Sequence, residues 1–232
     1  MTVKIGNPDK TNQKIKDIIS LVKINEDYLN NSNDFREYIL KSVNNSSAVL
    51  DVGKSMRNKY EKLNVKKKNT LDLNKFQDYP DFQLDLSDPD LKIEQTELYK
   101  KYDEIICLAV LEHVYDPFVA LDNLKKMLKN NGIIYGYVPF LYFYHAPKTL
   151  IFQDFYRYSK DGLAYLFRDF NELNIYPVRG RLPSSLHILL GSFWKKFLEK
   201  KIINNFLNKM TSKSSNHNQS SGYYFVAKKN EN

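Results

Sequence analysis

Three aspartates in the first half of the sequence are the first candidates for chemistry, because each follows a short apolar run. They are Asp51, Asp72 and Asp85. Short apolar runs separated by long connections are typical of a parallel sheet that is covered on both faces. The carboxyl ends of parallel strands share one edge, where open α/β folds bind ligands. We therefore expect the three carboxylates to mark a nucleotide pocket, and simple turn formation at strand ends is the alternative.

A second candidate group lies in the aromatic segment 139–159. His145 could take a proton from a hydroxyl group as a general base, and an ordinary hydrogen bond to the backbone is the alternative. The side chains of this segment that we expect beside a bound acceptor are Tyr142, Tyr144, Tyr156 and Arg157. Arg157 has a second interpretation, because Asp154 could pair with it and pin the loop.

Cysteine chemistry and a metal centre are not expected. The one cysteine, Cys107, lies in the apolar run 105–111, where a buried hydrophobic role is more common than a nucleophilic one. The sequence has no zinc-ligand spacing, so we expect no metal. We expect His113 to order the turn before Asp116 rather than to take part in chemistry.

Alternating helices and strands are predicted as the scaffold for these residues. Apolar residues at helical spacing over 15–43 predict two helices, separated by asparagines near 30–33. The expected strands are 48–53, 69–72, 82–85, 104–110, 133–138, 173–178 and 223–227. Asp116 and Pro117 are typical of a helix start, and Asn131–Gly132 of its end. Ser159 is expected to cap a further helix.

The domain organisation follows from length and composition. The 232 residues, of which 42% are hydrophobic, fit one large α/β domain. We expect an N-terminal helical segment at 1–46 and the main domain at 47–232, with a helical insertion at about 184–221. The polar N-terminus lacks the apolar core of a secretory signal, and no stretch reaches the roughly 20 apolar residues that cross a bilayer. We therefore expect a cytoplasmic protein.

The net charge of +8 raises the question of nucleic-acid binding. We consider a nucleic-acid partner unlikely, because the lysines are spread along a chain that is also rich in Asn and Ile. The segment 185–210 is the exception, since it combines apolar and aromatic residues with lysines. A helix packed on the sheet, a lid or a homodimer contact is the more common explanation. Peripheral contact with an anionic inner membrane surface is the alternative.

The order of these motifs resembles the class I S-adenosylmethionine-dependent methyltransferases, over about residues 47–228. The resemblance is carried by Val49-Leu50-Asp51-Val52-Gly53, Tyr102-Asp103-Glu104-Ile105-Ile106, Leu111-Glu112-His113-Val114, Asp116-Pro117 and Leu128-Lys129-Asn130-Asn131-Gly132. It implies a Rossmann-like three-layer α/β sandwich. The sheet would have seven strands, mostly parallel, with an antiparallel last strand. The implied cofactor is S-adenosyl-L-methionine.

The resemblance also implies roles for single positions. Asp72 would accept hydrogen bonds from the ribose hydroxyls, and Asp51 would help to hold the methionyl amino end. The further residues implied at the cofactor are Gly53, Lys54, Ser55, Asp85, Leu86, Leu108 and Ala109. Asp85 and Leu86 would lie at the adenine. Glu112 would face the cofactor from the loop after the fourth strand, and we expect it on the acceptor side.

The glycine loop departs from the family pattern. The family reads Gly-x-Gly-x-Gly, whereas this chain reads Gly53-Lys54-Ser55-Met56-Arg57. A side chain normally restricts positive φ and close approach. Ser55 is small enough to fit, and Lys54 or Arg57 could pair with the cofactor carboxylate. We therefore expect a variant cofactor loop, and a non-catalytic scaffold with weakened cofactor binding is the alternative.

The segment 139–159 resembles methyltransferases of bacterial surface-polysaccharide and glycoconjugate clusters, through its His-x-Pro and Asp-Phe-Tyr-Arg residues. This resemblance implies methyl transfer to a hydroxyl of a sugar or glycoconjugate acceptor, either a small molecule or a lipid-linked intermediate. His145 would be the base. An RNA methyltransferase is a further alternative, favoured only by the net charge.

Overall fold

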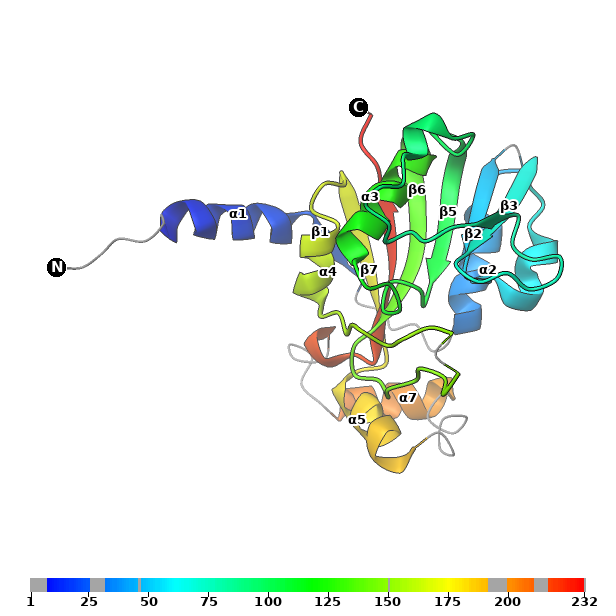
Figure 1. The fold of residues 1–232 in the computed structure, drawn as a ribbon. Helices are drawn as coiled ribbons and strands as arrows, with labels where there is room; N and C mark the ends of the chain where they lie inside the picture. The colour runs from blue at the N-terminus through cyan, green and yellow to red at the C-terminus, as the bar shows by residue number, and fades with distance from the viewer. Residues whose placement is uncertain are drawn as a thin grey trace.

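An eight-stranded sheet forms the centre of the computed structural model, which describes residues 8–25, 32–45, 47–149, 151–191, 200–210 and 217–231 (Figure 1). The strands are β1 (Val22–Ile24), β2 (Ala48–Val52), β3 (Lys67–Asp72), β4 (Phe82–Gln83), β5 (Tyr102–Leu108), β6 (Leu128–Pro139), β7 (Glu172–Val178) and β8 (Gly222–Lys228). Their order is β1-β7-β8-β6-β5-β2-β3-β4. β8 is antiparallel to β6 and β7, and every other neighbouring pair is parallel. The expected mostly parallel sheet with an antiparallel last strand is confirmed.

Helices cover both faces of the sheet and complete the three layers. On one face α3 (Pro117–Met127) and α4 (Lys160–Leu166) pack with the sheet into the larger core cluster. On the other face α2 (Ser32–Ser42) contributes Phe35 and Ile39 to a second cluster. Short 3₁₀ helices are η1 (Arg57–Lys62), η2 (Ile93–Gln95) and η4 (His217–Gln219).

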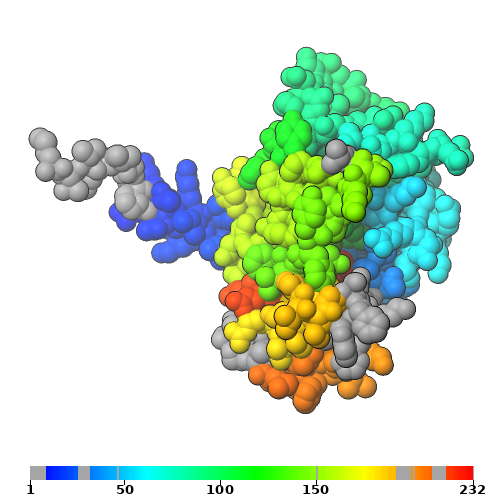
Figure 2. Space-filling model, turned by 60° about the horizontal axis from the view of Figure 1, so that its bottom comes forward, coloured from blue at the N-terminus to red at the C-terminus, as the bar shows by residue number. Residues whose placement is uncertain are grey.

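Three further helices lie outside these layers. α1 (Pro8–Ser20) projects from the side of the body (Figure 1). α5 (Arg181–Leu190) follows the end of β7 directly and packs with α7 (Lys201–Lys209) beyond the carboxyl ends of the strands. Figure 2 shows residues 140–149 and 151–160, in yellow-green, beside α5 on this side. In the part of the chain that the structure describes, no helix has the length and apolar character to span a bilayer.

The sheet has one strand more than the seven that we expected, because a strand replaces part of the helical region 15–43. β1 lies at the edge of the sheet and pairs in parallel with β7, with Val22 opposite Leu173. Val22 also packs against the core. Three residues are too few to show the alternation of apolar and polar side chains that indicates a strand. The helical spacing of apolar residues on either side therefore led to the prediction of helix for this region.

The start of α3 is as expected, but its end is not. The Asp116 carboxylate accepts hydrogen bonds from the backbone N–H groups of Phe118 and Val119, at 3.1 Å each. The helix ends at Met127 and β6 begins at once with Leu128. The expected stop at Asn131–Gly132 is therefore wrong, because Leu128 already pairs with Tyr102 of β5. The serine cap of α4 is confirmed, since Ser159 Oγ accepts a hydrogen bond from the Gly162 N–H at 3.1 Å.

Candidate functional site

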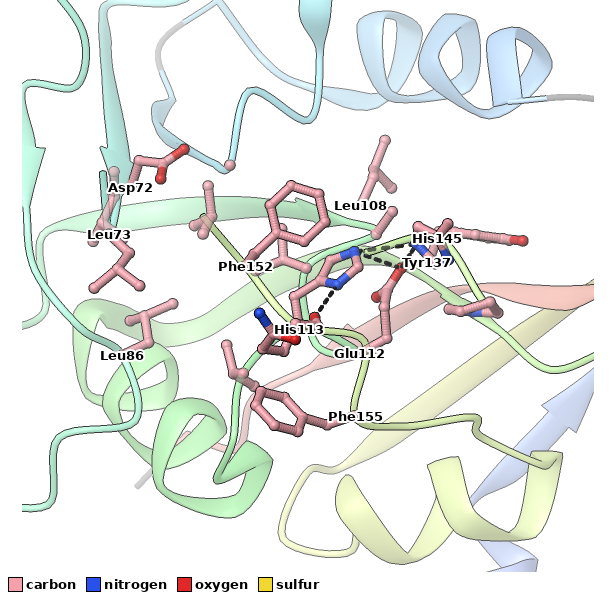
Figure 3. A pocket seen from close by; sticks show the side chains of 18 of the residues that line it. Asp72, Leu73, Leu86, Leu108, Glu112, His113, Tyr137, His145, Phe152 and Phe155 are labelled. Atoms are coloured by element: carbon pink, nitrogen blue, oxygen red, sulfur yellow. Dashed lines mark hydrogen bonds and ion pairs between the residues drawn. The ribbon is translucent and has the colours of Figure 1, made fainter. Parts of the chain in front are cut away.

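A cavity of about 800 Å³ opens at the carboxyl ends of β2, β3, β5 and β6. The expected site residues that line it are Gly53, Asp72, Asp85, Leu86, Leu108, Ala109, Glu112, Tyr142 and His145. The expected site residues that do not line it are Asp51, Lys54, Ser55, Tyr144, Tyr156 and Arg157. The two groups of candidates, one at the strand ends and one in the segment 139–159, therefore meet in one cavity (Figure 3).

The loop after β2 forms one wall of the cavity. Gly53 has φ of 66°, and a Cβ there would lie 2.7 Å from Val110 Cγ2, so both conformation and space favour glycine. Lys54 and Arg57 also have positive φ, 52° each, although they are not glycines. Arg57 lines the cavity, whereas Lys54 turns away and places its Nζ 4.3 Å from the centre of the Tyr79 ring.

The buried side chains of Asp51, near the end of β2, and of Ser55, within the loop, hold the loop in place. Ser55 Oγ donates to the Val52 carbonyl at 2.5 Å and accepts from the Leu108 N–H at 2.7 Å, so it joins β2 to β5. The Asp51 carboxylate is 1% exposed and accepts from the Met56 N–H at 3.1 Å. Burial raises the pKa of Asp51 to about 7. Both side chains are engaged within the loop instead of facing the cavity.

Asp72 is the carboxylate best placed to bind a ligand hydroxyl. It is the last residue of β3 and lines the cavity. Its Oδ2 accepts from the Tyr79 hydroxyl at 3.0 Å and its Oδ1 from the Asn74 N–H at 3.0 Å. A carboxylate has about four lone-pair sites, so each oxygen can still accept another hydrogen bond. The Tyr79 hydroxyl in turn accepts from the Lys54 N–H at 2.8 Å, and it thereby links the loop after β2 to Asp72.

Apolar side chains surround the region next to Asp72. Leu73 and Leu86 lie near Asp72 at one end of the view in Figure 3, and Phe152 lies further in. Asp85 lies two residues beyond the short strand β4, and its Oδ1 accepts from the Ser87 N–H at 2.8 Å. This end of the cavity combines carboxylates with apolar walls, which suits a nucleoside.

Glu112, His113 and His145 converge at the other end of the cavity (Figure 3). The Nε2 atoms of the two histidines are 3.2 Å apart. Glu112 Oε1 lies 3.7 Å from His113 Nε2 and 3.8 Å from His145 Nε2. Burial raises the pKa of Glu112 to about 8 and lowers the pKa of His113. We expected His113 only to order a turn, and its position in this cluster became evident only from the fold.

The segment after β6 is fixed by an ion pair. Asp154 pairs with Arg157, whose Nη2 donates to Asp154 Oδ2 at 2.6 Å and to the Phe143 carbonyl at 2.6 Å. Burial alone would raise the pKa of Asp154, but the Arg157 guanidinium and the His145 N–H lower it to about 2. Arg157 therefore pins the loop, as the second interpretation had it. Tyr144 is 70% exposed, and the Tyr156 hydroxyl donates to the Tyr115 carbonyl at 2.7 Å.

Arg179, which is not among the residues expected from the sequence, is a buried cation of the cavity wall. It is 4% exposed, and its Nε and Nη1 have no hydrogen-bond partner among the described residues. It lines the cavity together with Tyr137 and Tyr224. Arg179 follows β7 directly in sequence, but 34 residues separate it from His145, and only the folded sheet brings the two into one cavity.

Comparison with known proteins gives one short sequence match. No model of a known protein family matches the chain. A segment of 43 residues is 42% identical to the ubiquinone biosynthesis O-methyltransferase of Histophilus somni (strain 2336). The segment spans 18% of this chain and 18% of that enzyme, so the match covers less than a fifth of the relative's length.

Comparison with solved structures gives a similarity of fold that extends over most of the chain. A SAM-dependent methyltransferase from Archaeoglobus fulgidus has a TM-score of 0.52 at 14% identity and covers 85% of this chain and 92% of its own. The [4+2]-cyclase SpnF has a TM-score of 0.53 at 11% identity, over 97% and 94%. Phosphoethanolamine N-methyltransferase 2 of Haemonchus contortus, with bound S-adenosyl-L-methionine, has a TM-score of 0.52 at 13% identity, over 85% and 52%. These values show that the chain has the fold of the class I SAM-dependent methyltransferases.

Proposed function

We propose that this protein transfers a methyl group from S-adenosylmethionine to a hydroxyl oxygen of a sugar or glycoconjugate. The observation that carries the proposal is the division of one cavity into two ends. Asp72 and apolar side chains form one end, and the Glu112, His113 and His145 side chains form the other (Figure 3). A methyl donor and an acceptor have to meet in such a cavity, because the transfer needs both reacting atoms within contact distance.

The residues at the nucleoside end fit the cofactor in chemical type. Asp72 offers two hydrogen-bond acceptors to a pair of ribose hydroxyls, and Leu86 and Leu73 offer an apolar surface to the adenine. Gly53 allows the backbone to approach the ligand closely, and Arg57 supplies a cation for the methionyl carboxylate. Bound S-adenosylmethionine would supply an electrophilic methyl group on its sulfonium. Ser55, by contrast, uses its hydroxyl within the loop.

His145 is the proposed proton acceptor for the attacking hydroxyl. Its Nδ1 lies 3.1 Å from Asp154 Oδ2 and 3.1 Å from the Phe143 carbonyl, and these acceptors fix the ring. Its Nε2 faces His113 at the cavity wall. With Nδ1 protonated, Nε2 carries the lone pair that can accept the proton. Asp154 thus positions the ring, and Arg157 positions Asp154.

The proposal of a sugar acceptor is supported by the aromatic and cationic lining of the acceptor end. Tyr142 lines the cavity and offers a ring face to a sugar, whereas Tyr144 and Tyr156 lie outside the lining. The guanidinium of Arg179 is buried, and its Nε and Nη1 have no hydrogen-bond partner among the described residues. This favours an acceptor that carries an anionic group, since a buried charge without partners is costly. A sugar linked through phosphate, as in a lipid-linked intermediate, combines these features.

Binding and turnover test the proposal separately. Calorimetry with S-adenosylmethionine and S-adenosylhomocysteine tests the cofactor site, and no heat of binding at millimolar ligand would favour the scaffold alternative. Transfer of labelled methyl to a panel of neutral sugars, sugar phosphates and lipid-diphosphate sugars tests the acceptor. Arg179→Gln should raise KM for phosphate-linked sugars more than for neutral ones. An equal change in KM of Arg179→Gln for neutral and for phosphate-linked sugars, relative to wild type, would contradict the anionic acceptor.

Contact with a membrane surface belongs to the same proposal. Leu189 of α5 is 79% exposed, and Ile202 and Phe206 of α7 are 85% and 64% exposed. Residues 192–199 of the candidate segment 185–210 lie outside the described residues. Flotation with anionic vesicles should recover the wild-type protein, and substitution of the three apolar residues by serine should abolish recovery. Unchanged flotation of the variant would contradict membrane contact through this surface.

A further inference from the structure

Three potential metal ligands converge at the acceptor end of the cavity. Glu112, His113 and His145 each offer one donor atom, and the three atoms lie within 4.8 Å of one another. Glu112 and His113 come from the loop after β5, whereas His145 comes from the segment after β6. The sequence spacing gives no metal-binding motif, because His145 lies 32 residues from its partner.

The hydrogen bonds of the two rings leave the lone pair of each ring on its Nε2 atom. His113 Nδ1 lies 2.6 Å from the Gln153 carbonyl oxygen. His145 Nδ1 lies 3.1 Å from the Phe143 carbonyl and 3.1 Å from the Asp154 carboxylate. These oxygens can only accept, so each Nδ1 must carry the proton, and each neutral ring then has its lone pair on Nε2. Two lone pairs that face each other at 3.2 Å repel unless a positive species lies between or beside them.

The carboxyl group of Glu112 has one oxygen without a partner in the part of the chain that the structure describes. Glu112 is 1% exposed, and its Oε2 has no hydrogen-bond partner among the described residues. The neighbouring guanidinium of Arg157 is already engaged by Asp154 and by backbone carbonyls. A buried carboxylate is costly unless it is paired or coordinates a metal. A cation bound next to Glu112 would satisfy the carboxylate and both imidazoles at once.

We propose that Glu112, His113 and His145 bind one divalent first-row transition-metal cation. The separation of 3.2 Å between the two Nε2 atoms is close to the roughly 3.3 Å between ligands that lie about 2.0–2.1 Å from a tetrahedral metal. Two imidazoles and one carboxylate suit zinc, manganese, iron or cobalt, whereas magnesium and calcium prefer oxygen ligands only.

The surroundings of the cluster resemble the outer shell of known metal sites. A metal-bound histidine commonly donates its other N–H to a carboxylate or a backbone carbonyl, which fixes the ring. His113 does so to Gln153, and His145 does so to Phe143 and Asp154. Glu112 Oε1 is 3.7 and 3.8 Å from the two nitrogens. The carboxyl group would have to approach them by about 0.4–0.5 Å to reach tetrahedral spacing.

The cation would leave coordination positions open towards the cavity, which the three side chains line. That an acceptor oxygen occupies such a position rests on the proposed function, whereas metal binding itself does not. With a cation bound, the lone pair of His145 Nε2 is used in coordination, so this histidine would hold the acceptor through the metal instead of taking its proton. The metal therefore offers a second way in which the same three residues prepare a hydroxyl for transfer.

Titration of the tag-free protein with Co²⁺ and Zn²⁺ tests the site. We expect one equivalent of Co²⁺ to produce visible absorption bands, and Zn²⁺ to displace it, with Mg²⁺ as a weak competitor. Glu112→Gln, His113→Gln and His145→Gln should each weaken binding by at least 10-fold, since even outer-shell changes cost about 10–100-fold. His217→Gln is the matched control, because it removes a histidine that is not one of the three proposed ligands.

Two results would overturn the proposal. One is the absence of saturable Co²⁺ or Zn²⁺ binding by the wild-type protein at millimolar metal, a result that does not depend on how the variants fold. The other is binding that persists in the three cluster variants or is lost with His217→Gln. Calorimetry with S-adenosylhomocysteine on the same samples separates the two proposals. Ligand binding without metal binding would contradict the metal site alone, and metal binding without ligand binding would contradict the proposed function alone.

Discussion

Replacement of Asp72 by alanine is the sharpest test of the cofactor site. In the proposed complex the Asp72 carboxylate accepts hydrogen bonds from two ribose hydroxyls, and a hydrogen bond to a charged group contributes about 1.5–3 kcal/mol. Loss of two such bonds at the lower value costs about 3 kcal/mol, which corresponds to a little over 100-fold in Kd. Asp72→Asn keeps one carbonyl oxygen as an acceptor and should weaken binding by roughly 10-fold.

The assay is calorimetry with S-adenosylhomocysteine, supported by thermal unfolding. A ligand at 100 times its Kd stabilises the folded state by about 2.7 kcal/mol, and a 100-fold weaker ligand at the same concentration by only about 0.4 kcal/mol. The matched control is Asp88→Ala. Like Asp72, Asp88 accepts a hydrogen bond from the backbone N–H two residues later, at 2.9 Å to Asp90, but it does not line the cavity.

A folded Asp72→Ala protein that binds S-adenosylhomocysteine within about 3-fold of wild type, a difference below about 0.7 kcal/mol, would refute the assignment of Asp72 to the ribose. Equal weakening in Asp88→Ala would refute it too, because the effect would then come from the lost turn. The comparison separates a ligand contact from local backbone support, which a single variant cannot do.

Two further predictions concern stability. Gly136→Ala should lower the free energy of unfolding by about 3 kcal/mol or change the fold, because the new Cβ would lie 1.9 Å from the Phe225 ring. Gly162→Ala is the control, because the nearest atom to its new Cβ is 3.4 Å away. Equal urea midpoints for the two variants would contradict the packing of Gly136 against Phe225. Burial raises the pKa of Asp51 from 3.8 to about 7, so the folded state binds more protons than the unfolded state between these values. Stability should therefore fall by up to about 4 kcal/mol as pH rises through this window. Asp51→Asn, which keeps an acceptor for the Met56 N–H, should flatten this slope, and an unchanged slope would contradict the assignment.

The parts of the fold that depend on local sequence could be predicted. Asp116 and Ser159 cap their helices as expected, because a side-chain oxygen next to a free N–H is a local event. The positions of most strands along the chain, and the aspartate at the end of β3, also follow from the apolar runs. β1 could not be predicted, since its three residues become a strand only through pairing with β7.

The acceptor end of the site could be predicted only in part. His145 was a candidate because of its residue type, but its orientation depends on Asp154 and Phe143. The contact between His113 and His145 joins positions 32 residues apart. The segment after β6 closes this distance by packing on the loop after β5, where the Phe155 N–H donates to the Glu112 carbonyl at 2.8 Å. Such long-range docking leaves no pattern in a single sequence.

The altered glycine loop is the feature that bears most directly on whether the protein binds its cofactor. Lys54 and Arg57 adopt positive φ, a conformation that costs a non-glycine residue of the order of 1–3 kcal/mol and persists only when the surroundings determine it. The surroundings here do so. Ser55 joins β2 to β5 through its hydroxyl, and the Arg36 Nε donates to the Ser55 carbonyl at 2.7 Å.

A loop that had lost its function would be expected to relax to unstrained conformations, because nothing would maintain the cost. The Ser55 hydroxyl instead supplies hydrogen bonds where the family pattern has a glycine, and Asp51 holds the next turn through Met56. The positive φ of Arg57 leaves its side chain at the cavity, where a cation can meet the cofactor carboxylate. The strain is thus retained at the point where a ligand would gain from it. This favours a rebuilt cofactor loop over a decayed one, and it makes Arg57 rather than Lys54 the residue expected to hold the carboxylate.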